Sequence, residues 1–405
     1  MSASIDWLDS LQGSGIRPGL GRMRALLRAL RRPEKQVPAI IVAGTNGKGS
    51  TSATMASILR ASGYRTGLYT SPHLVDLRER WAIDGANVDD AALDDAVATL
   101  RRASERTGIL PTYFEALTLL AFIIFAHARC DVSVLEVGMG GRLDATNVVQ
   151  PVAAIITPIG IDHVEYLGRT LRKITMEKAG VIHRGAVVLT SNSDPLILGI
   201  LERRARVFGN RFVVVGEEHD TPLAGPFQRR NAALAARAAE ELRGLLPKIT
   251  PESIERGVAE TRWRGRLEHL ESGGKSIWID GCHNAHAAAP VAAFIEATLP
   301  RPRTLVFGIM DDKNVDAVTR KLFPLFDLVL TTEPYPPRNE SAESLARAAR
   351  ALGVTSEAWP QPRRALQRAL ATSPGTIFIG GSLYLAGAAI AFFDAQRQQR
   401  SEKQR

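Results

Sequence analysis

Cysteine is scarce in this sequence, with only Cys130 and Cys282 among 405 residues. Two cysteines cannot form a disulfide framework, so we expect a reducing, cytoplasmic location. The longest apolar runs, 117–126 and 383–393, are too short to span a bilayer, and no membrane partner is expected. The N-terminal residues lack the basic start and the apolar centre of a secretion signal.

Charge is only moderately unbalanced, because 51 Lys and Arg residues face 42 Asp and Glu residues, a formal net charge of +9. Such an excess is compatible with nucleic acid or with an acidic small substrate. However, aromatic residues make up only 6% of the chain, and no basic run has aromatic residues interleaved. We therefore expect arginines on solvated surfaces and no nucleic-acid partner.

The chain is long enough for two domains, and no internal repeat interrupts it. Strand and helix patterns alternate along it, which predicts an α/β fold. The pattern resets near residues 263–268. We predict a P-loop-type domain with a central, mostly parallel sheet over 1–265, and a smaller Rossmann-like α/β domain over 266–405.

A glycine-rich stretch, residues 44–51 (GTNGKGST), follows an apolar run rich in β-branched residues and precedes a helical pattern over 52–61. Strand, glycine turn and helix together form a phosphate cradle, because the helix start offers free N–H groups. Lys48 can reach outer phosphates, and Ser50 or Thr51 can hold magnesium. Gly49 separates Lys48 from Ser50, unlike the usual P-loop spacing, so a glycine turn without a ligand is the alternative.

Carboxylates stand at the ends of two later apolar strands. The run 131–136 ends in Glu136, before a glycine-rich loop, and the run 152–158 leads to Asp162 and His163. A carboxylate at the carboxyl end of a parallel strand, in the sheet that carries a phosphate loop, lies where a magnesium ligand is needed. We expect His163 to contact metal or phosphate, although a lone histidine is usually structural.

Other polar positions leave two interpretations open. Lys178, just before Ala-Gly on an apolar-faced helix, is either a surface residue or a buried amine with a lowered pKa. Tyr113, at the start of a long apolar helix, belongs either to the core or to a site. In the second half, polar loops follow strands at 280–284 (DGCHN), 308–313 (GIMDDK) and 380–382 (GGS).

Six motifs follow one another along the chain: 44–50 (GTNGKGS), 70–74 (TSPHL), 136–147 (EVGMGGRLDATN), 162–163 (DH), 177–180 (EKAG) and 280–284 (DGCHN). In this order they resemble the folylpolyglutamate synthase/dihydrofolate synthase family of the Mur ligase superfamily, from about Trp7 to Gly387. The resemblance implies an ATP-dependent ligase that adds L-glutamate to the carboxylate of folates, and also of 7,8-dihydropteroate, through an acyl phosphate. Folylpolyglutamate synthase activity alone is the alternative.

The resemblance also implies the cofactors and the site residues. ATP is matched to Asn46, Gly47, Lys48, Gly49, Ser50, Thr51, Asn231, Arg266 and Asp280. Two magnesium sites are matched to Ser71, Glu136, His163 and Lys178, the last carbamylated by carbon dioxide. Substrate is matched to Thr112, Tyr113, Leu143, Asp144, Ala145, His283 and Ser382, and catalysis to Lys48, Lys178, His163, His283 and Asp280. The implied partners are ATP, L-glutamate and a folate or dihydropteroate, and we expect a monomer.

Some positions depart from the family pattern, but none removes a charged ligand. Cys282 and Ala285 stand where the family often has Ala and Pro, and Arg264 stands where it has Pro.

Three rival functions predict different features. A peptidoglycan-precursor Mur ligase needs an N-terminal nucleotide-sugar domain, and only about forty residues precede Gly44. A non-catalytic P-loop module would bind nucleotide without carboxylate-dependent turnover. A family member without activity is disfavoured by the presence of Lys48, Glu136, His163 and Lys178.

Overall fold

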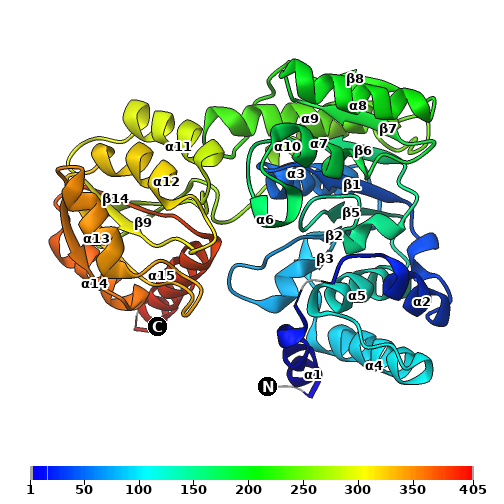
Figure 1. Cartoon of the computed structure of the whole chain (residues 1–405), viewed down its shortest axis with the longest axis horizontal. Helices are drawn as coiled ribbons and strands as arrows, with labels where there is room; N and C mark the ends of the chain where they lie inside the picture. Colours follow the sequence, from blue (N-terminus) through cyan, green and yellow to red (C-terminus); the bar gives the residue numbers. More distant parts are fainter. Residues whose placement is uncertain (1–2, 16, 404–405) are drawn as a thin grey trace. The chain divides into compact units, whose positions relative to one another are not determined.

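The computed structural model describes residues 3–15 and 17–403. This part of the chain forms two compact units, each built on its own sheet (Figure 1). Unit 1 contains the described residues up to Pro72, then Arg78–Pro222 and Arg229–Arg262. Unit 2 contains His73–Leu77, Leu223–Gln228 and the described residues from Trp263 onward. The predicted boundary between residues 265 and 266 stays a prediction.

An eight-stranded sheet with the order β4-β3-β2-β5-β1-β6-β7-β8 forms the centre of unit 1. Six strands run parallel: β1 (Ala39–Ala43), β2 (Thr66–Tyr69), β5 (Val132–Glu136), β6 (Ala153–Ile156), β7 (Val187–Thr190) and β8 (Phe212–Val214). β3 (Trp81–Ile83) and β4 (Ala86–Asn87) extend it antiparallel. Every residue of β1 and β5 is buried, as continuous apolar strands of a parallel sheet require. The predicted mostly parallel sheet is confirmed.

Helices alternate with the strands of unit 1: α1 (Ala3–Ser10), α2 (Gly21–Ala29), α3 (Lys48–Ala61), α4 (Asp90–Thr107), α5 (Tyr113–His127), α6 (Val164–Leu167), α7 (Leu171–Ala179), α8 (Pro195–Val207), α9 (Pro226–Leu242) and α10 (Pro251–Ala259). The first residues of α9 are grouped with unit 2. Helix α3 begins four residues earlier than predicted, because Gly47 adopts a left-handed conformation as its N-cap. Short 3₁₀ helices lie at Gln12–Ser14, Pro33–Lys35, Leu77–Arg80, Ala145–Val148 and Phe323–Leu325.

Unit 2 contains a six-stranded sheet with the order β13-β12-β11-β14-β10-β9. Its strands are β9 (Glu268–Ser272), β10 (Lys275–Ile279), β11 (Arg303–Phe307), β12 (Leu328–Thr331), β13 (Thr355–Ala358) and β14 (Thr376–Gly380), and only β9 is antiparallel to its neighbour. The helices are α11 (Ala285–Thr298), α12 (Val315–Leu322), α13 (Ala342–Ala351), α14 (Pro362–Thr372) and α15 (Leu383–Lys403). The sequence analysis did not predict β9, β13 or α14. Both strands lie at sheet edges and are partly exposed, so their apolar pattern is weak.

Alternate residues of the unit 2 strands enter two separate apolar clusters. Leu305, Phe307 and Phe378 belong to one cluster, whereas Val306 and Ile377 belong to the other. Successive strand residues point to opposite faces, so the two clusters cover the two faces of this sheet. We call them the Phe307 cluster and the Val306 cluster.

No helix among the described residues is long and apolar enough to cross a membrane.

Candidate functional site

The glycine-rich turn between β1 and α3 is packed too tightly for side chains at two positions. Gly44 and Gly47 have φ angles of 150° and 87°, both outside the range that suits other residues. A Cβ at Gly44 would overlap the hydroxyl of Thr157, and a Cβ at Gly47 would lie 2.5 Å from Asn231 Oδ1. Both glycines are therefore required, and α3 starts at the turn with its positive end, where an anion binds well.

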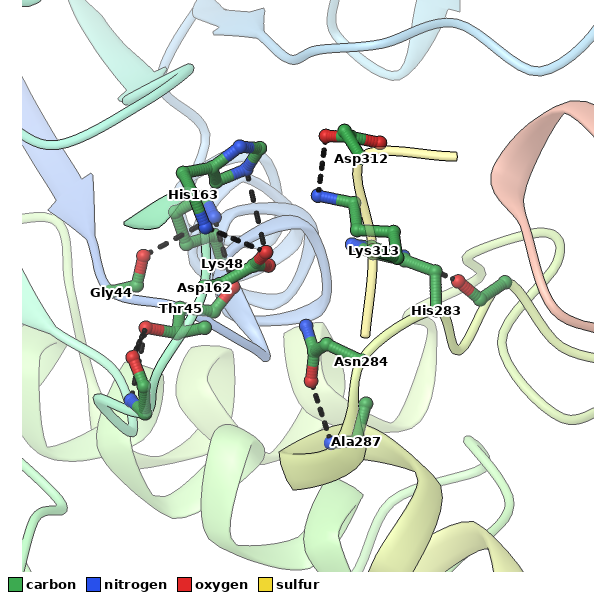
Figure 2. Close-up of polar contacts among 12 residues, drawn as sticks. Gly44, Thr45, Lys48, Asp162, His163, His283, Asn284, Ala287, Asp312 and Lys313 are labelled. Atoms are coloured by element: carbon green, nitrogen blue, oxygen red, sulfur yellow. Dashed lines mark hydrogen bonds and ion pairs between the residues drawn. The ribbon is translucent and has the colours of Figure 1, made fainter. Parts of the chain in front are cut away.

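Lys48 turns back onto the loop that precedes it. Its Nζ donates to the carbonyl oxygens of Gly44 at 3.3 Å and Thr45 at 3.1 Å (Figure 2). Thr45 in turn joins the β6 loop, because its hydroxyl donates to Gly160 O and accepts from Gly160 N–H, both at 3.0 Å. The loop carries its cation in a fixed place beside the helix start.

Lys178 is a buried amine, which decides between the two interpretations of the sequence. It is 4% exposed, and its Nζ donates to Gly44 O at 2.5 Å. Burial, and to a smaller extent the charge of nearby Lys48, lower its pKa to about 7, while Asp162 and Asp144 act in the opposite sense. Much of this amine is therefore uncharged near neutral pH.

Oxygen donors gather at the carboxyl ends of β2, β5 and β6. Glu136 is buried at the end of β5, and its Oε2 accepts the backbone N–H of Ser71 at 3.1 Å. His163 has a φ of 49°, its N–H donates to Asp162 Oδ1 at 2.9 Å, and its Nε2 lies 3.9 Å from Asp162 Oδ2 (Figure 2).

This donor set fits magnesium, which prefers carboxylate and hydroxyl oxygens. Thr51 adds to it, because its Oγ1 is buried one turn into α3 and forms no hydrogen bond within the described chain. Over the same residues, no group of three or more His, Cys, Asp or Glu side chains could hold a metal ion. A magnesium site here would therefore use serine, threonine or a modified lysine together with Glu136.

Residues 138–147, which we call the 138–147 loop, are organised by a buried carboxylate. Asp144 accepts from Met139 N–H at 2.9 Å, from Thr146 N–H at 3.0 Å and from Thr146 Oγ1 at 2.7 Å. Burial raises the pKa of Asp144, whereas these hydrogen bonds lower it. Asp144 is thus committed to the loop itself, and neighbouring Leu143 is 38% exposed.

The 138–147 loop lies against the end of α7 that carries Lys178. A Cβ at Gly141 would lie 2.8 Å from Glu177 O and 2.9 Å from Lys178 O. Asn147 Nδ2 also donates to Gly180 O at 3.2 Å. These contacts pack the loop against the end of α7, while the Lys178 side chain itself reaches Gly44.

The start of α5 supports the same loop. Thr112 caps α5 by accepting Glu115 N–H at 3.3 Å, and Glu115 Oε2 accepts Thr112 N–H at 2.8 Å. The ring of Phe114 fills the space where a side chain at Gly138 would lie. Tyr113 is half-buried. The Thr112 side chain therefore serves the helix end, and Tyr113 retains some exposed surface.

Sequence reasoning missed Asn192, a buried residue beyond β7. Its Oδ1 accepts Ile159 N–H at 2.8 Å, and its Nδ2 donates to Thr157 O at 3.0 Å. Asn192 therefore fixes the turn that leads from β6 to Asp162. A polar residue just after a buried strand was the available signal, the same one that identified Glu136.

Unit 2 brings four predicted residues to the carboxyl ends of its parallel strands. Buried Asp280 follows β10 and accepts Leu267 N–H at 2.9 Å and Cys282 N–H at 2.8 Å. Burial raises the pKa of Asp280, and the guanidinium of Arg266 lowers it. Arg266 lies close to Gly281, where a Cβ would be 2.7 Å from Nη1.

Two further unit 2 residues have defined hydrogen-bond roles. His283 Nδ1 lies 2.8 Å from Gly281 O and must donate to it, so a neutral ring carries its proton on Nδ1 (Figure 2). Ser382 is buried, and its Oγ accepts Leu385 N–H at 3.0 Å at the start of α15. The Ser382 hydroxyl oxygen therefore caps the start of α15.

Comparisons with known proteins cover almost the whole chain. Residues 42–224 match the Mur ligase middle domain, and residues 265–383 match the Mur ligase glutamate ligase domain. The dihydrofolate synthase/folylpolyglutamate synthase of Bacillus subtilis is 31% identical, over 93% of this chain and 95% of that protein. The structure of E. coli FolC in complex with DHPP and ADP has a TM-score of 0.87 at 30% identity, covering 98% of this chain and 99% of that one. The structure of Mycobacterium tuberculosis folylpolyglutamate synthase complexed with ADP has a TM-score of 0.86 at 31% identity, covering 96% of this chain and 98% of that one.

Proposed function

The chain belongs to the folylpolyglutamate synthase/dihydrofolate synthase family of Mur ligases, and on that basis we propose that it joins L-glutamate to the carboxylate of folates and of 7,8-dihydropteroate at the expense of ATP. One observation supports this chemistry above all. The buried amine of Lys178 and the amine of Lys48 meet at Gly44 O in a glycine turn that suits phosphate. A simple nucleotide switch has no need of the second, uncharged amine.

The reaction divides into two steps with separate demands. The substrate carboxylate attacks the γ-phosphorus of ATP, and ADP leaves, which gives an acyl phosphate. The glutamate amine then attacks the acyl carbon, loses a proton, and expels phosphate to leave the amide. Lys48 and the N-terminus of α3 stabilise the negative charge on the phosphates in the first step. Magnesium, held by Ser71, Glu136 and His163, would supply further charge neutralisation.

Lys178 is proposed to carry a carbamate. Its uncharged amine attacks carbon dioxide, a nitrogen–carbon bond forms, and one proton leaves to solvent. The product replaces a cation with an anionic oxygen ligand suited to a second magnesium ion. The lowered pKa near 7 supports this step, because only the uncharged amine is nucleophilic.

The residues on the substrate side are proposed from the family resemblance. Tyr113, Leu143 and Ala145 are proposed to border the pterin side of the substrate, while Asp144 and Thr112 hold the backbone that presents them. His283 and Ser382 are proposed to contact the incoming glutamate. Asn46, Gly47, Gly49, Ser50, Thr51, Asn231, Arg266 and Asp280 are proposed to contact ATP. The cytoplasmic location and the monomeric state stay predictions.

A two-acceptor assay tests the proposal. Purified protein with ATP, magnesium and L-glutamate should release phosphate only when dihydropteroate or a reduced folate monoglutamate is added, and the amide product should appear in equal amount. Release with both acceptors supports the bifunctional enzyme, and release with the folate alone supports the folylpolyglutamate synthase. If neither acceptor stimulates release, the proposed function is wrong.

A further inference from the structure

Two short segments that precede Trp263 in the chain belong to unit 2. We call His73–Leu77 the first strap and Leu223–Gln228 the second strap. Leu74 of the first strap packs against the Val306 cluster, and Phe227 of the second packs against the Phe307 cluster. The straps are therefore anchored on opposite faces of the unit 2 sheet.

Both straps touch the same turn of unit 2. Leu74 Cδ1 lies 3.2 Å from the point where a Cβ at Gly265 would be. In the second strap, a Cβ at Gly225 would lie 2.7 Å from Leu267 Cδ1. Both straps thus contact the turn 265–267, whose middle residue is Arg266.

Each strap continues within a few residues into the phosphate site of unit 1. Ser71, whose N–H bonds to Glu136, is three residues before Leu74, a length of chain that spans at most about 11 Å. Asn231, which abuts Gly47, is four residues after Phe227 in α9. Residues four apart share a helix face and are separated by about 6 Å along the axis.

We propose that Leu74 and Phe227 are positioning residues for the ligase reaction. Leu74 holds Ser71 in place beside Glu136, and Phe227 holds Asn231 in place beside the phosphate loop, each by anchoring its strap to the turn that carries Arg266. The inference rests on the proposed function, since it treats Ser71 as a metal ligand and Asn231 as a nucleotide contact. Loss of an anchor would displace Ser71 or Asn231 without changing any group that touches substrate.

Matched variants separate this role from simple core filling. Leu74→Ala is compared with Leu370→Ala, because both leucines are partly buried against the Val306 cluster. Phe227→Ala is compared with Leu325→Ala, because both side chains are partly buried against the Phe307 cluster. Leu74→Met and Phe227→Leu keep an apolar anchor and serve as rescue variants.

Three measurements are made on the full-length protein: kcat and KM for ATP, calorimetric affinity for ADP, and amide hydrogen exchange. Leu74→Ala should lower kcat on the order of tenfold to a hundredfold, since small misplacements at a reaction centre are costly. It should also speed exchange in residues 66–72. Phe227→Ala should weaken ADP binding by about tenfold, a loss of about 1.4 kcal/mol, and speed exchange around Asn231. The control and rescue variants should behave as the wild type in all three.

The outcomes distinguish the two proposals. If the wild type is active and the strap variants match their controls in kinetics, ADP affinity and exchange, the positioning role is wrong. If the wild type shows no acceptor-dependent phosphate release, the proposed function is wrong. In that case the exchange comparison alone decides whether the straps hold residues 66–72 and Asn231, and equal exchange in strap and control variants overturns the inference.

Discussion

Lys178 and Lys48 direct their amino groups to one backbone oxygen, that of Gly44, at 2.5 and 3.3 Å. Burial removes water from around Lys178 and so disfavours its charged form. The nearby charge of Lys48 disfavours it further. The pKa of Lys178 is accordingly lowered to about 7. The two lysines therefore differ: Lys178 is an amine that is readily neutral, and Lys48 is the cation proposed to bind phosphate.

The first prediction concerns the carbamate. Protein incubated with ¹³C-labelled bicarbonate should show one carbamate resonance by NMR, and Lys178→Ala should lack it. The same variant should lose ligase activity while its circular dichroism spectrum stays unchanged, because it removes the proposed oxygen ligand. Full activity of Lys178→Ala in the absence of bicarbonate would contradict the carbamate.

The second prediction concerns stability and pH in buffer free of carbon dioxide. The pKa of Lys178 is lowered from 10.5 to about 7, so between these values the unfolded chain binds the proton and the folded chain does not. The free energy of unfolding then rises with pH across this window. Relative to Lys178→Met, the wild type should gain about 2 kcal/mol between about pH 7 and about pH 9 in urea titrations. Parallel pH curves would show that the pKa is not lowered.

The third prediction uses two glycines with the same φ of 87°, Gly47 and Gly185. Alanine at either position costs about 1–2 kcal/mol in backbone strain. At Gly185 nothing lies within 4 Å of the new Cβ, whereas at Gly47 the Cβ meets Asn231. Thermal unfolding should therefore show a loss for both variants, but calorimetry should show weakened ADP binding only for Gly47→Ala. Equal ADP affinity for the two variants would remove Gly47 and Asn231 from the nucleotide site.

The strand-end residues of the site could be predicted from the sequence, because each follows an apolar run that must be buried. Glu136, Asp162 and Asp280 were predicted in this way. Glu136 is the last residue of β5, Asp280 directly follows β10, and Asp162 lies in the loop that follows β6. The family resemblance added roles that the runs do not carry. The two sheets were predicted for the same reason, apart from β3 and β4 in unit 1 and β9 and β13 in unit 2. β3 and β4 are only three and two residues long, and the partly exposed residues of β9 and β13 give little apolar signal.

The burial of Lys178 and the anchoring of Leu74 could not be predicted. The Lys178 side chain is buried and contacts Gly44, and the 138–147 loop packs on the end of α7; both contacts join segments far apart in the chain, which no local pattern records. Leu74 lies in a short segment with Val75 and Leu77, without the periodicity that marks a core residue, yet it packs against a cluster formed mostly by residues beyond 270. Such placements depend on tertiary contacts rather than on local sequence.

The fourth prediction tests Asp144 as the organiser of the 138–147 loop. Asp144→Asn turns one acceptor oxygen into an NH₂ donor that faces buried N–H or O–H donors, which should cost about 2–3 kcal/mol. Thr146→Val is the matched control, because it removes only the 2.7 Å bond from Thr146 Oγ1 and should cost about 1 kcal/mol. Asp144→Asn should speed hydrogen exchange across the loop and raise the KM for dihydropteroate or folate, with ADP affinity unchanged. If the two variants alter loop exchange and KM to the same small extent, the three bonds of Asp144 do not determine the shape of the loop.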